Sequence, residues 1–152
     1  KILQMQTMTY GTTESTTSTS YVDSSITDSI TPVSSSNNVL VLCGVPTYCV
    51  KTGAVSAGTR ARMYVSIFRG DKDGTKLQEC ALGWNGYDSS SEINFTSEGM
   101  ATFAYIDSPS TTSAQTYTMC FKVLNTNYTG YVNNDYGSDA ISNIVLLEVD
   151  GT

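Results

Sequence analysis

The sequence predicts an all-β fold, an antiparallel β-sandwich or jelly roll of about eight to nine strands. Short runs rich in Val, Ile, Tyr, Phe and Thr recur about every ten residues, and turn-forming residues bound each run. No stretch has the caps and periodicity of a helix, so no helical crossover is available to build a parallel sheet. At 152 residues and 16.3 kDa the chain has the size of one domain, placed at residues 1–152.

The first third of the chain contains three predicted strands. Ile2–Tyr10 precedes a hydroxyl-rich tract over 12–20, which we expect to be an exposed edge or a loop. Tyr21–Ile30 follows and ends before Pro32, which cannot donate a hydrogen bond to a ladder. Val39–Val45 is a nearly continuous apolar run, which is typical of a strand buried on both faces.

A β-hairpin is predicted in the middle of the chain. Arg62–Phe68 and Leu77–Leu82 flank a turn that contains an Arg-Gly-Asp tripeptide and ends in Asp73-Gly74. An Asp-Gly pair is a strong hairpin signal because glycine adopts positive φ without strain, so we place the positive φ at Gly74. The turn explains the Arg-Gly-Asp tripeptide without an integrin-type role. Gly83–Glu92 is expected to be a long polar loop.

Three further strands complete the predicted sandwich. Met100–Asp107 and Thr116–Leu124 alternate apolar and polar residues, and Ile141–Val149 is the last strand. Asn125–Asp139 is expected to be a second long loop. One face of the penultimate strand is expected in the core: Tyr117, Met119, Phe121 and Val123.

The composition excludes several classes of function. Charged residues make up 14% of the chain, whereas 20 Ser and 22 Thr supply most of its polar groups, and there is no His. Without His there is no Ser-His-Asp triad, Cys-His pair or imidazole ligand. A net charge of −6 and a pI near 4.3 argue against nucleic-acid binding, and no apolar run has the length of a membrane span. We therefore expect a protein that is not an enzyme, holds no cofactor or metal, and inserts into no membrane.

The four cysteines leave two interpretations open. Cys43 and Cys49 flank a bend predicted at Gly44–Tyr48, and this bend would bring them within range of a disulfide. Alternatively, all four are buried thiols that act as small apolar side chains. No Cys-x-x-Cys pair is present, so zinc is not expected.

The acidic residues offer no favoured pair for glycoside hydrolysis, which needs two carboxylates across a groove. Most of them lie in predicted turns. Glu79 and Glu148 lie in predicted strands, and the apolar neighbours of Glu148 indicate that it faces outward.

Aromatic residues embedded in polar loops are the strongest signal of a binding site. Flat rings stack on sugar faces and amide or carboxylate groups meet hydroxyls, while Tyr, Asn and Ser also dominate protein-binding loops. The alternative is that these Tyr residues pack at the ends of the sheets or against a neighbouring subunit. The candidate ligand-binding residues are Trp84, Tyr87, Tyr128, Tyr131, Asn134, Asp135 and Tyr136.

Several short segments stand in a fixed order along nearly the whole chain: Ile2–Gln6, Thr16–Asp23, Ile30–Ser36, Val39–Leu42, Ile67–Gly70, Tyr105–Pro109, Tyr117 and Ile144–Val149. In this order and spacing they resemble a β-rich domain of tailed-bacteriophage virion proteins, notably tail fibres of marine phages. The sequence departs from that pattern at Cys43, Cys49 and Cys80, and in the loops around Trp84 and Asn133. The family offers no catalytic residues to carry over.

The resemblance implies a virion structural protein, a tail-fibre or attachment domain that contacts the host surface from an extracellular particle. It also implies self-association as a homotrimer, contacts with other virion proteins, and a bacterial surface glycan or protein as receptor. Two alternatives remain: a capsid decoration or head-fibre protein without a receptor role, and a free carbohydrate-binding module. Because Lys1 is not an initiator Met, we expect a trimmed N-terminus or a domain that follows a longer fibre.

Overall fold

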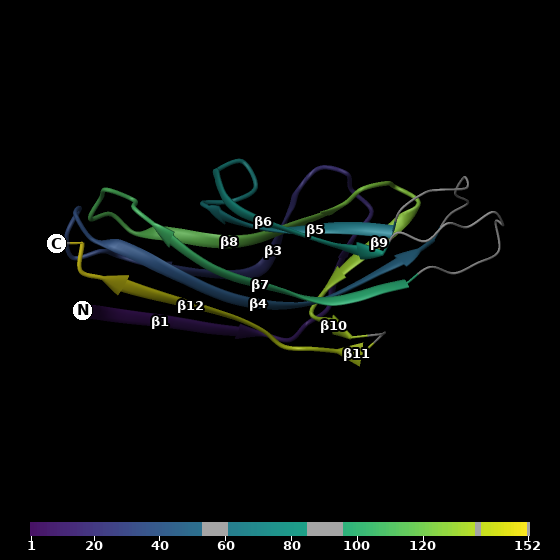
Figure 1. The fold of residues 1–152 in the computed structure, drawn as a ribbon, viewed down its shortest axis with the longest axis horizontal. Coiled ribbons are helices and arrows are strands. Elements are labelled where there is room, and N and C mark those ends of the chain that lie inside the picture. Colours follow the sequence, from purple (N-terminus) through teal and green to yellow (C-terminus); the bar gives the residue numbers. More distant parts are fainter. Residues whose placement is uncertain (53–60, 85–95, 136–137, 152) are drawn as a thin grey trace.

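The computed structural model describes residues 1–52, 61–84, 96–135 and 138–151, with Trp84 described by its backbone alone. This part of the chain is all β without a helix, and its antiparallel sheets form a sandwich (Figure 1), which confirms the predicted fold class. It contains twelve strands where eight or nine were predicted. They are β1 (Ile2–Tyr10), β2 (Glu14–Thr16), β3 (Val22–Ile30), β4 (Asn38–Lys51), β5 (Ala61–Arg69), β6 (Thr75–Trp84), β7 (Thr96–Asp107), β8 (Gln115–Val123), β9 (Tyr128–Val132), β10 (Asn134–Asp135), β11 (Ser138–Asp139) and β12 (Ser142–Val149).

Two sheets and one small hairpin make up the architecture. The first sheet has the order β1-β12-β4-β9-β2, and β7 pairs with the other side of β4. β4 is long enough for β12 and β9 to pair with its two halves in turn, while β7 pairs along nearly its whole length. The second sheet has the order β3-β8-β5-β6, and β10 pairs with β11. Both chain ends lie at one end of the sandwich, and β10 and β11 lie toward the other (Figure 1).

The core lies between the sheets and consists of alternate side chains of the central strands. On β4, Val39, Val41 and Val45 face inward and are fully buried, whereas Leu40 and Leu42 face outward and are partly exposed. The prediction that this run is buried on both faces is wrong, because no third layer of described residues covers it. The prediction for β8 is confirmed, since all four residues of its apolar face are buried: Tyr117, Met119, Phe121 and Val123.

β4 continues straight through Pro46, where the sequence predicted a bend. Pairing with β12 ends at Gly44 and pairing with β9 begins at Thr47, so Pro46 stands where the neighbouring strand changes. Its carbonyl oxygen accepts a hydrogen bond from the Asn133 N–H at 2.9 Å on this same side. The missing N–H of proline therefore faces the gap between β12 and β9, where no ladder hydrogen bond is lost.

The continuity of β4 excludes the disulfide considered between Cys43 and Cys49. Both residues lie in this one strand, and six residues of extended chain separate their backbones by ~20 Å, whereas a disulfide needs Cα atoms within ~7 Å. All four cysteines are free thiols, and Cys43, Cys49 and Cys120 are buried. The alternative of buried thiols therefore describes these three residues.

Thiol labelling follows this burial. Burial raises the pKa of Cys43 and of Cys49 to about 12, so both stay protonated at neutral pH and react poorly. We expect the half-buried Cys80 to be alkylated first in the native protein, and Cys43 and Cys49 only after unfolding. Peptide mass spectrometry after timed iodoacetamide treatment measures this order, and equal labelling of Cys43 and Cys80 in the native state would contradict it.

The hairpin predicted between β5 and β6 is confirmed, but the two glycines of its turn have other roles than expected. The positive φ, at 94°, belongs to Gly70. Gly74 is required by space, since a Cβ atom there would lie 2.3 Å from the Arg69 carbonyl oxygen. Arg69 is not displayed as part of an exposed Arg-Gly-Asp motif, because its guanidinium forms an ion pair with Asp107 at 3.0 Å.

Strands also occupy two of the three segments that were predicted as polar tracts or loops, whereas residues 85–92 of the loop predicted over Gly83–Glu92 lie outside the described part of the chain. The hydroxyl-rich tract contains β2, which pairs with β9 at the end of the first sheet, so this tract includes an edge strand. The loop predicted over Asn125–Asp139 is wrong in large part, because Tyr128 and Val132 of β9 are core residues. Gly130 lies between them, and a Cβ atom there would come within 2.9 Å of a Val123 methyl group.

Glu148 in β12 is fully buried, and the prediction that it faces outward is wrong. It shares the inward face with Leu146, and its carboxylate accepts hydrogen bonds from Gln4 Nε2 at 2.6 Å, Asn37 Nδ2 at 2.6 Å and the Val33 N–H at 2.8 Å. Burial opposes ionisation of this carboxyl, but the hydrogen bonds outweigh it and lower the pKa of Glu148 below its ordinary value. A buried, ionised glutamate thus connects β12 with β1 and with the segment before β4.

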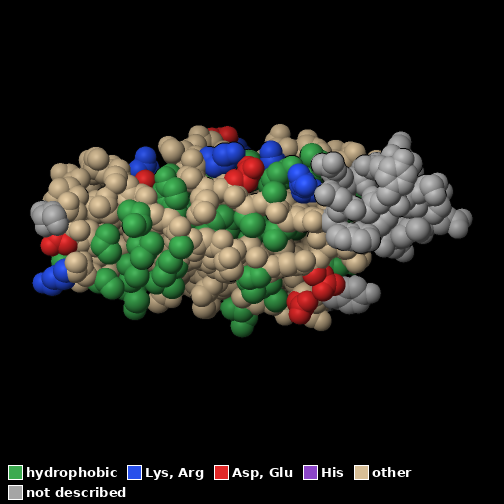
Figure 2. Space-filling model, in the orientation of Figure 1, with side chains coloured by type: hydrophobic (Ala, Val, Ile, Leu, Met, Phe, Trp, Pro, Cys, Tyr) green, Lys and Arg blue, Asp and Glu red, His purple; other side chains and the backbone are tan. Residues whose placement is uncertain are grey.

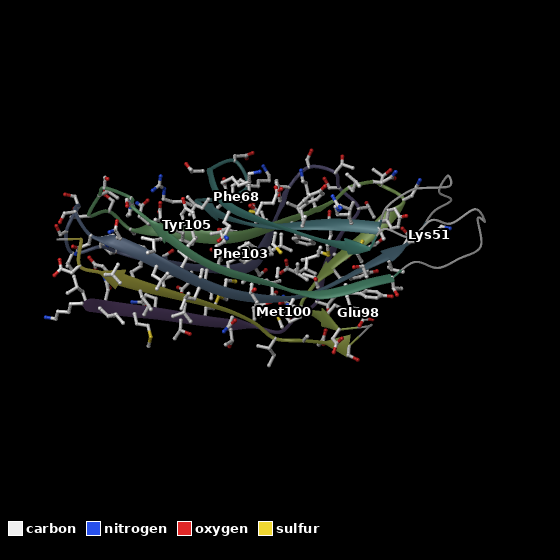
Figure 3. All side chains as sticks on the ribbon, viewed as in Figure 1. Lys51, Phe68, Glu98, Met100, Phe103 and Tyr105 are labelled. Atoms are coloured by element: carbon white, nitrogen blue, oxygen red, sulfur yellow. The ribbon has the colours of Figure 1, made fainter. Side chains whose placement is uncertain are left out.

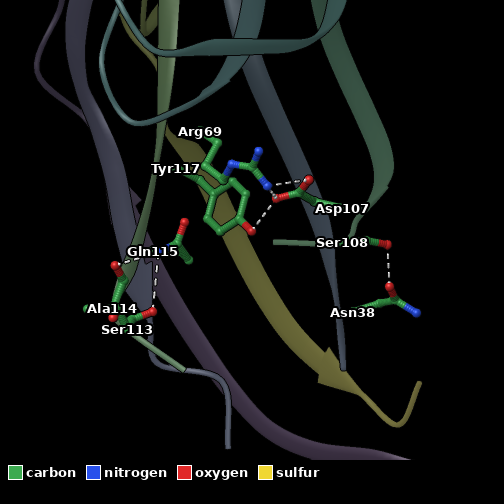
Figure 4. Close-up of polar contacts among 8 residues, drawn as sticks. All are labelled: Asn38, Arg69, Asp107, Ser108, Ser113, Ala114, Gln115 and Tyr117. Atoms are coloured by element: carbon green, nitrogen blue, oxygen red, sulfur yellow. Dashed lines mark hydrogen bonds and ion pairs between the residues drawn. The ribbon is translucent and has the colours of Figure 1, made fainter. Parts of the chain in front are cut away.

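A second buried carboxylate joins the two sheets (Figure 4). Asp107 ends β7 in the first sheet, and its carboxylate accepts hydrogen bonds from Arg69 of β5 at 3.0 and 3.1 Å and from the Tyr117 hydroxyl of β8 at 2.7 Å. Both partners belong to the second sheet. Burial, followed by the hydrogen bond to Asp107, raises the pKa of Tyr117, so its hydroxyl remains a donor.

Candidate functional site

A pocket of about 410 Å³ opens where β10 meets the paired strands β4 and β7. We call it the β7–β10 pocket. Its lining comes from four places in the sequence, so it exists only in the folded chain. The lining residues are Pro46, Thr47, Glu98, Gly99, Met100, Asn134, Asp135 and Ala140.

One wall of the pocket is set by the alternation of side chains along β7. Glu98 and Met100 point away from the core and are exposed, Met100 to 53%, whereas Phe103 lies between the sheets (Figure 3). In the register of the ladder, Pro46 of β4 lies opposite Met100. An apolar wall and an acidic group therefore stand side by side on the outer face of the first sheet.

A row of three side chains crosses the sheet and reaches the pocket at Glu98. Tyr131 of β9 pairs with Tyr48 of β4, and Tyr48 pairs with Glu98 of β7. Residues directly opposite in neighbouring strands share a face, so the two rings and the carboxylate point to the same side. The ring centroids of Tyr48 and Tyr131 are 5.7 Å apart at an angle of 40°, and both residues are half-buried.

Asn133 fixes the bend that brings β10 to the pocket. It has a φ of 58°, a left-handed conformation that Asn tolerates better than most residues. Its side chain is fully buried, donates from Nδ2 to the Thr12 carbonyl oxygen at 2.9 Å, and accepts a hydrogen bond from the Ser142 hydroxyl. These contacts hold Asn134 and Asp135, the next two residues, against β4.

Of the predicted ligand-binding residues, the structure brings Tyr131, Asn134 and Asp135 into this region. Asn134 is buried and donates to the Thr13 hydroxyl at 3.3 Å, so its role there is to support the pocket wall, while Asp135 is exposed. Tyr128 cannot contact a ligand, since it is 0% exposed in the core, and its inclusion in the predicted site is corrected.

The other predicted aromatic residues are not placed in the site. The backbone of Trp84 ends β6 in the second sheet, opposite Ala61, and its side chain lies outside the described part of the chain. Tyr87 and Tyr136 lie outside the described residues altogether.

Sequence reasoning missed Glu98, Met100, Pro46 and Tyr48. The signal for the first two was the alternation of β7, which begins four residues before the predicted start of that strand. Pro46 and Tyr48 were assigned to a bend, so their position on an outward strand face was not recognised.

The charge of the pocket limits its ligands. Glu98 and Asp135 are exposed carboxylates at its lining, and no Lys or Arg is among the lining residues that the structure describes. Acidic side chains also gather near β10 and β11 in Figure 2. Such a surface repels phosphate and sulfate groups, whereas carboxylates accept hydrogen bonds from hydroxyls and amines. The pocket can therefore bind a neutral or cationic polar ligand, with the tyrosine rings available for stacking.

The described ranges contain neither a metal-ligand cluster nor a membrane-spanning helix. No group of three or more His, Cys, Asp or Glu side chains there could hold a metal ion. Those ranges also contain no helix long and apolar enough to cross a membrane.

No protein-family model matches the chain, and no curated protein matches its sequence. Among solved structures, the chain is similar to the VP2 subviral particle of infectious bursal disease virus, with 11% identity over 95% of this chain and a TM-score of 0.39. It is also similar to the structure of the Gt strain of that virus, with 11% identity over 95% of this chain and a TM-score of 0.41. For the T13 particle of infectious bursal disease virus, the identity is 11% over 97% of this chain and the TM-score is 0.40. The match covers 36 to 37% of those longer chains.

Proposed function

We propose that this chain is a structural domain of a virus particle, of the tail-fibre or attachment type, and that it contacts the host surface through the β7–β10 pocket. The ordered segments that resemble phage virion domains support the virion role. Low charge also suits a protein exposed to variable salt, because little of its stability then depends on screened surface ion pairs.

The row of Tyr131, Tyr48 and Glu98 beside the pocket is the observation that carries the attachment role. It offers two rings for stacking and, with Asp135, two carboxylates for hydroxyl groups. A neutral glycan is the ligand that uses all of these groups together. Each contact is weak, and a homotrimeric domain repeated on one particle would multiply it by avidity. The role requires binding without turnover, which agrees with a chain that has no His.

The test is binding of a Tyr131→Ala variant to intact host cells and to arrayed neutral oligosaccharides. We expect the apparent affinity to fall about tenfold or more, because a stacked ring is lost. Tyr131→Phe keeps the ring and should retain most of the binding, which separates loss of stacking from loss of folding. Tyr64→Ala is the matched control, since Tyr64 is also half-buried but lies on the second sheet.

A second variant tests the acidic side of the pocket. Asp135→Asn removes one exposed charge without loss of packing, and we expect binding of neutral glycans to weaken while thermal stability stays unchanged. Equal cell binding by Tyr131→Ala, Asp135→Asn and the unmodified protein would contradict the proposal. Binding to purified capsids and not to cells would indicate a decoration protein, and a monomer that binds glycans a free carbohydrate-binding module.

A further inference from the structure

The β7–β10 pocket has an apolar side that stacking and carboxylate contacts with a glycan leave unused. Pro46 lines the pocket on the outer side of β4, and Met100 lies opposite it in the ladder. Ala140 adds a methyl group from the segment before β12. These three side chains offer a ligand only carbon and sulfur atoms, which cannot replace the hydrogen bonds that a sugar hydroxyl makes with water.

The Met100 side chain extends across the sheet toward β4. Gly44 is the outward-facing position of β4 two residues before Pro46, and a Cβ atom placed on it would lie 3.8 Å from Met100 Sδ. Because Gly44 has no side chain, the thioether fits into this space next to Pro46. Met100 still keeps 53% of its surface exposed. An apolar surface is therefore open to a ligand at Met100 and Pro46.

The polar groups around this apolar surface are acceptors. Glu98 and Asp135 are exposed carboxylates, which accept hydrogen bonds and donate none. The donors among the described lining side chains are engaged within the protein, since the Thr47 hydroxyl donates to a β7 carbonyl oxygen at 2.9 Å and Asn134 Nδ2 donates to the Thr13 hydroxyl at 3.3 Å. The lining therefore suits a ligand group that has a donor next to an apolar end.

The acetamido group, CH₃–CO–NH–, has this combination. Its N–H can donate to a carboxylate, and its methyl group can pack on the apolar surface. Its carbonyl oxygen can stay in water, because Glu98, Met100 and Asp135 are all exposed. We infer that the β7–β10 pocket selects glycans that carry N-acetyl groups. This inference rests on the attachment role in the proposed function and narrows its ligand from neutral glycans to N-acetylated ones.

The distance between the tyrosines and the apolar surface suits one sugar residue. Tyr48 and Pro46 point to the same side of β4 and are two residues apart, which in a strand is ~7 Å. Tyr131 stands beside Tyr48, with the ring centroids 5.7 Å apart. A sugar ring that stacks on the tyrosines can thus place a substituent over Pro46 and Met100.

Other ligand groups fit the same lining less well. A hydroxyl in place of the acetamido group sets a polar group against an apolar surface that offers it no partner. An ammonium group is attracted by the two carboxylates, but these are exposed, so water and salt weaken the attraction. An ammonium also loses hydration beside Met100 and Pro46. Phosphate and sulfate are repelled by the same carboxylates.

Three oligosaccharides of the same length and linkage test the inference, built from N-acetylglucosamine, from glucosamine and from glucose. Calorimetric titration of the chain with each measures the affinity. We expect the N-acetylated oligomer to bind about tenfold more tightly than the glucose oligomer, which is the discrimination that a small apolar group supplies in a matching pocket. It should also bind more tightly than the glucosamine oligomer.

A matched pair of substitutions on β7 assigns this preference to the pocket. Met100→Thr removes most of the apolar surface and keeps a residue that favours strands, so the preference should fall to about twofold or less. Ile106→Thr is the control, since Ile106 is 61% exposed on the same face of β7 but does not line the pocket. It should keep the full preference. Circular dichroism and melting temperature check that both variants fold.

The outcomes separate this inference from the attachment role. Equal affinity for the N-acetylated and glucose oligomers, with both lost in Tyr131→Ala, would overturn the inference and leave attachment through the pocket intact. Tighter binding of the glucosamine oligomer, or a preference that Met100→Thr keeps as fully as Ile106→Thr, would overturn it as well. If none of the three oligomers binds, the inference fails, and the attachment role then stands only if host cells bind the unmodified chain and not Tyr131→Ala.

Discussion

Replacing Glu148 by Gln is expected to lower the free energy of unfolding by about 3 kcal/mol. The charge-assisted hydrogen bonds are lost, and the new amide NH₂ group faces a neighbouring group that can itself only donate. The carboxylate accepts hydrogen bonds from the side-chain amides of Gln4 and Asn37 and from the Val33 N–H, so each of its partners acts as a donor. An amide in its place presents an NH₂ group to at least one of them. For a domain of this size, the melting temperature should fall by roughly 6–12 °C.

The same carboxyl makes stability depend on pH. Its pKa is lowered in the folded chain and ordinary in the unfolded chain, so the folded state binds the proton less readily. The stabilisation is therefore complete above the ordinary carboxyl pKa of about 4.3 and is lost as pH falls through the lower folded value. We expect the gap in stability between the unmodified chain and Glu148→Gln to be constant near neutral pH and to close in acid.

Glu98→Gln is the control for charge, because Glu98 is exposed on β7 and its replacement should change stability by less than about 0.5 kcal/mol. Urea unfolding of the three proteins between neutral and acid pH measures both effects. A Glu148→Gln variant as stable as Glu98→Gln, or a gap that widens in acid, would show that the buried carboxylate does not hold this end of the sandwich together.

The parts of the fold that were predictable are those decided by local alternation. β1 has the predicted bounds, and the buried face of β8 was read from every second residue. Both depend only on the period of two that any strand imposes on its side chains. The hairpin between β5 and β6 was also predictable, because its turn residues are adjacent in the sequence.

The parts that were not predictable depend on partners far away in the sequence. A proline such as Pro46 predicts a break in the strand. Only knowledge of the change of neighbour from β12 to β9 at this position shows that the strand can continue. Glu148 indicates an exposed position unless its donors, more than 100 residues away, are known. The polar sequence around Tyr128 hides a core strand for the same reason. In the pocket, Tyr131 and Asp135 were predicted from composition, but Glu98 could only be added once the register of β4 and β7 was known.

Replacing Asp107 by Ala should lower the free energy of unfolding by about 3 kcal/mol, because the Tyr117 hydroxyl then remains buried without its acceptor. Tyr117 is 0% exposed and cannot turn to water, whereas Arg69, with 27% of its side chain exposed, can. Most of the loss should therefore come from the tyrosine. Tyr117→Phe alone keeps the packing of the ring and should cost about 1 kcal/mol.

A double-mutant cycle separates these contributions. If most of the stability lost in Asp107→Ala comes from the unpaired Tyr117 hydroxyl, then adding Tyr117→Phe to that variant should restore part of it. The second substitution removes the buried donor that has lost its acceptor. Asp73→Asn is the control, because Asp73 forms an exposed ion pair with Lys72 and its loss should change stability by less than about 0.5 kcal/mol. Strictly additive losses in the double variant would show that the two groups act independently.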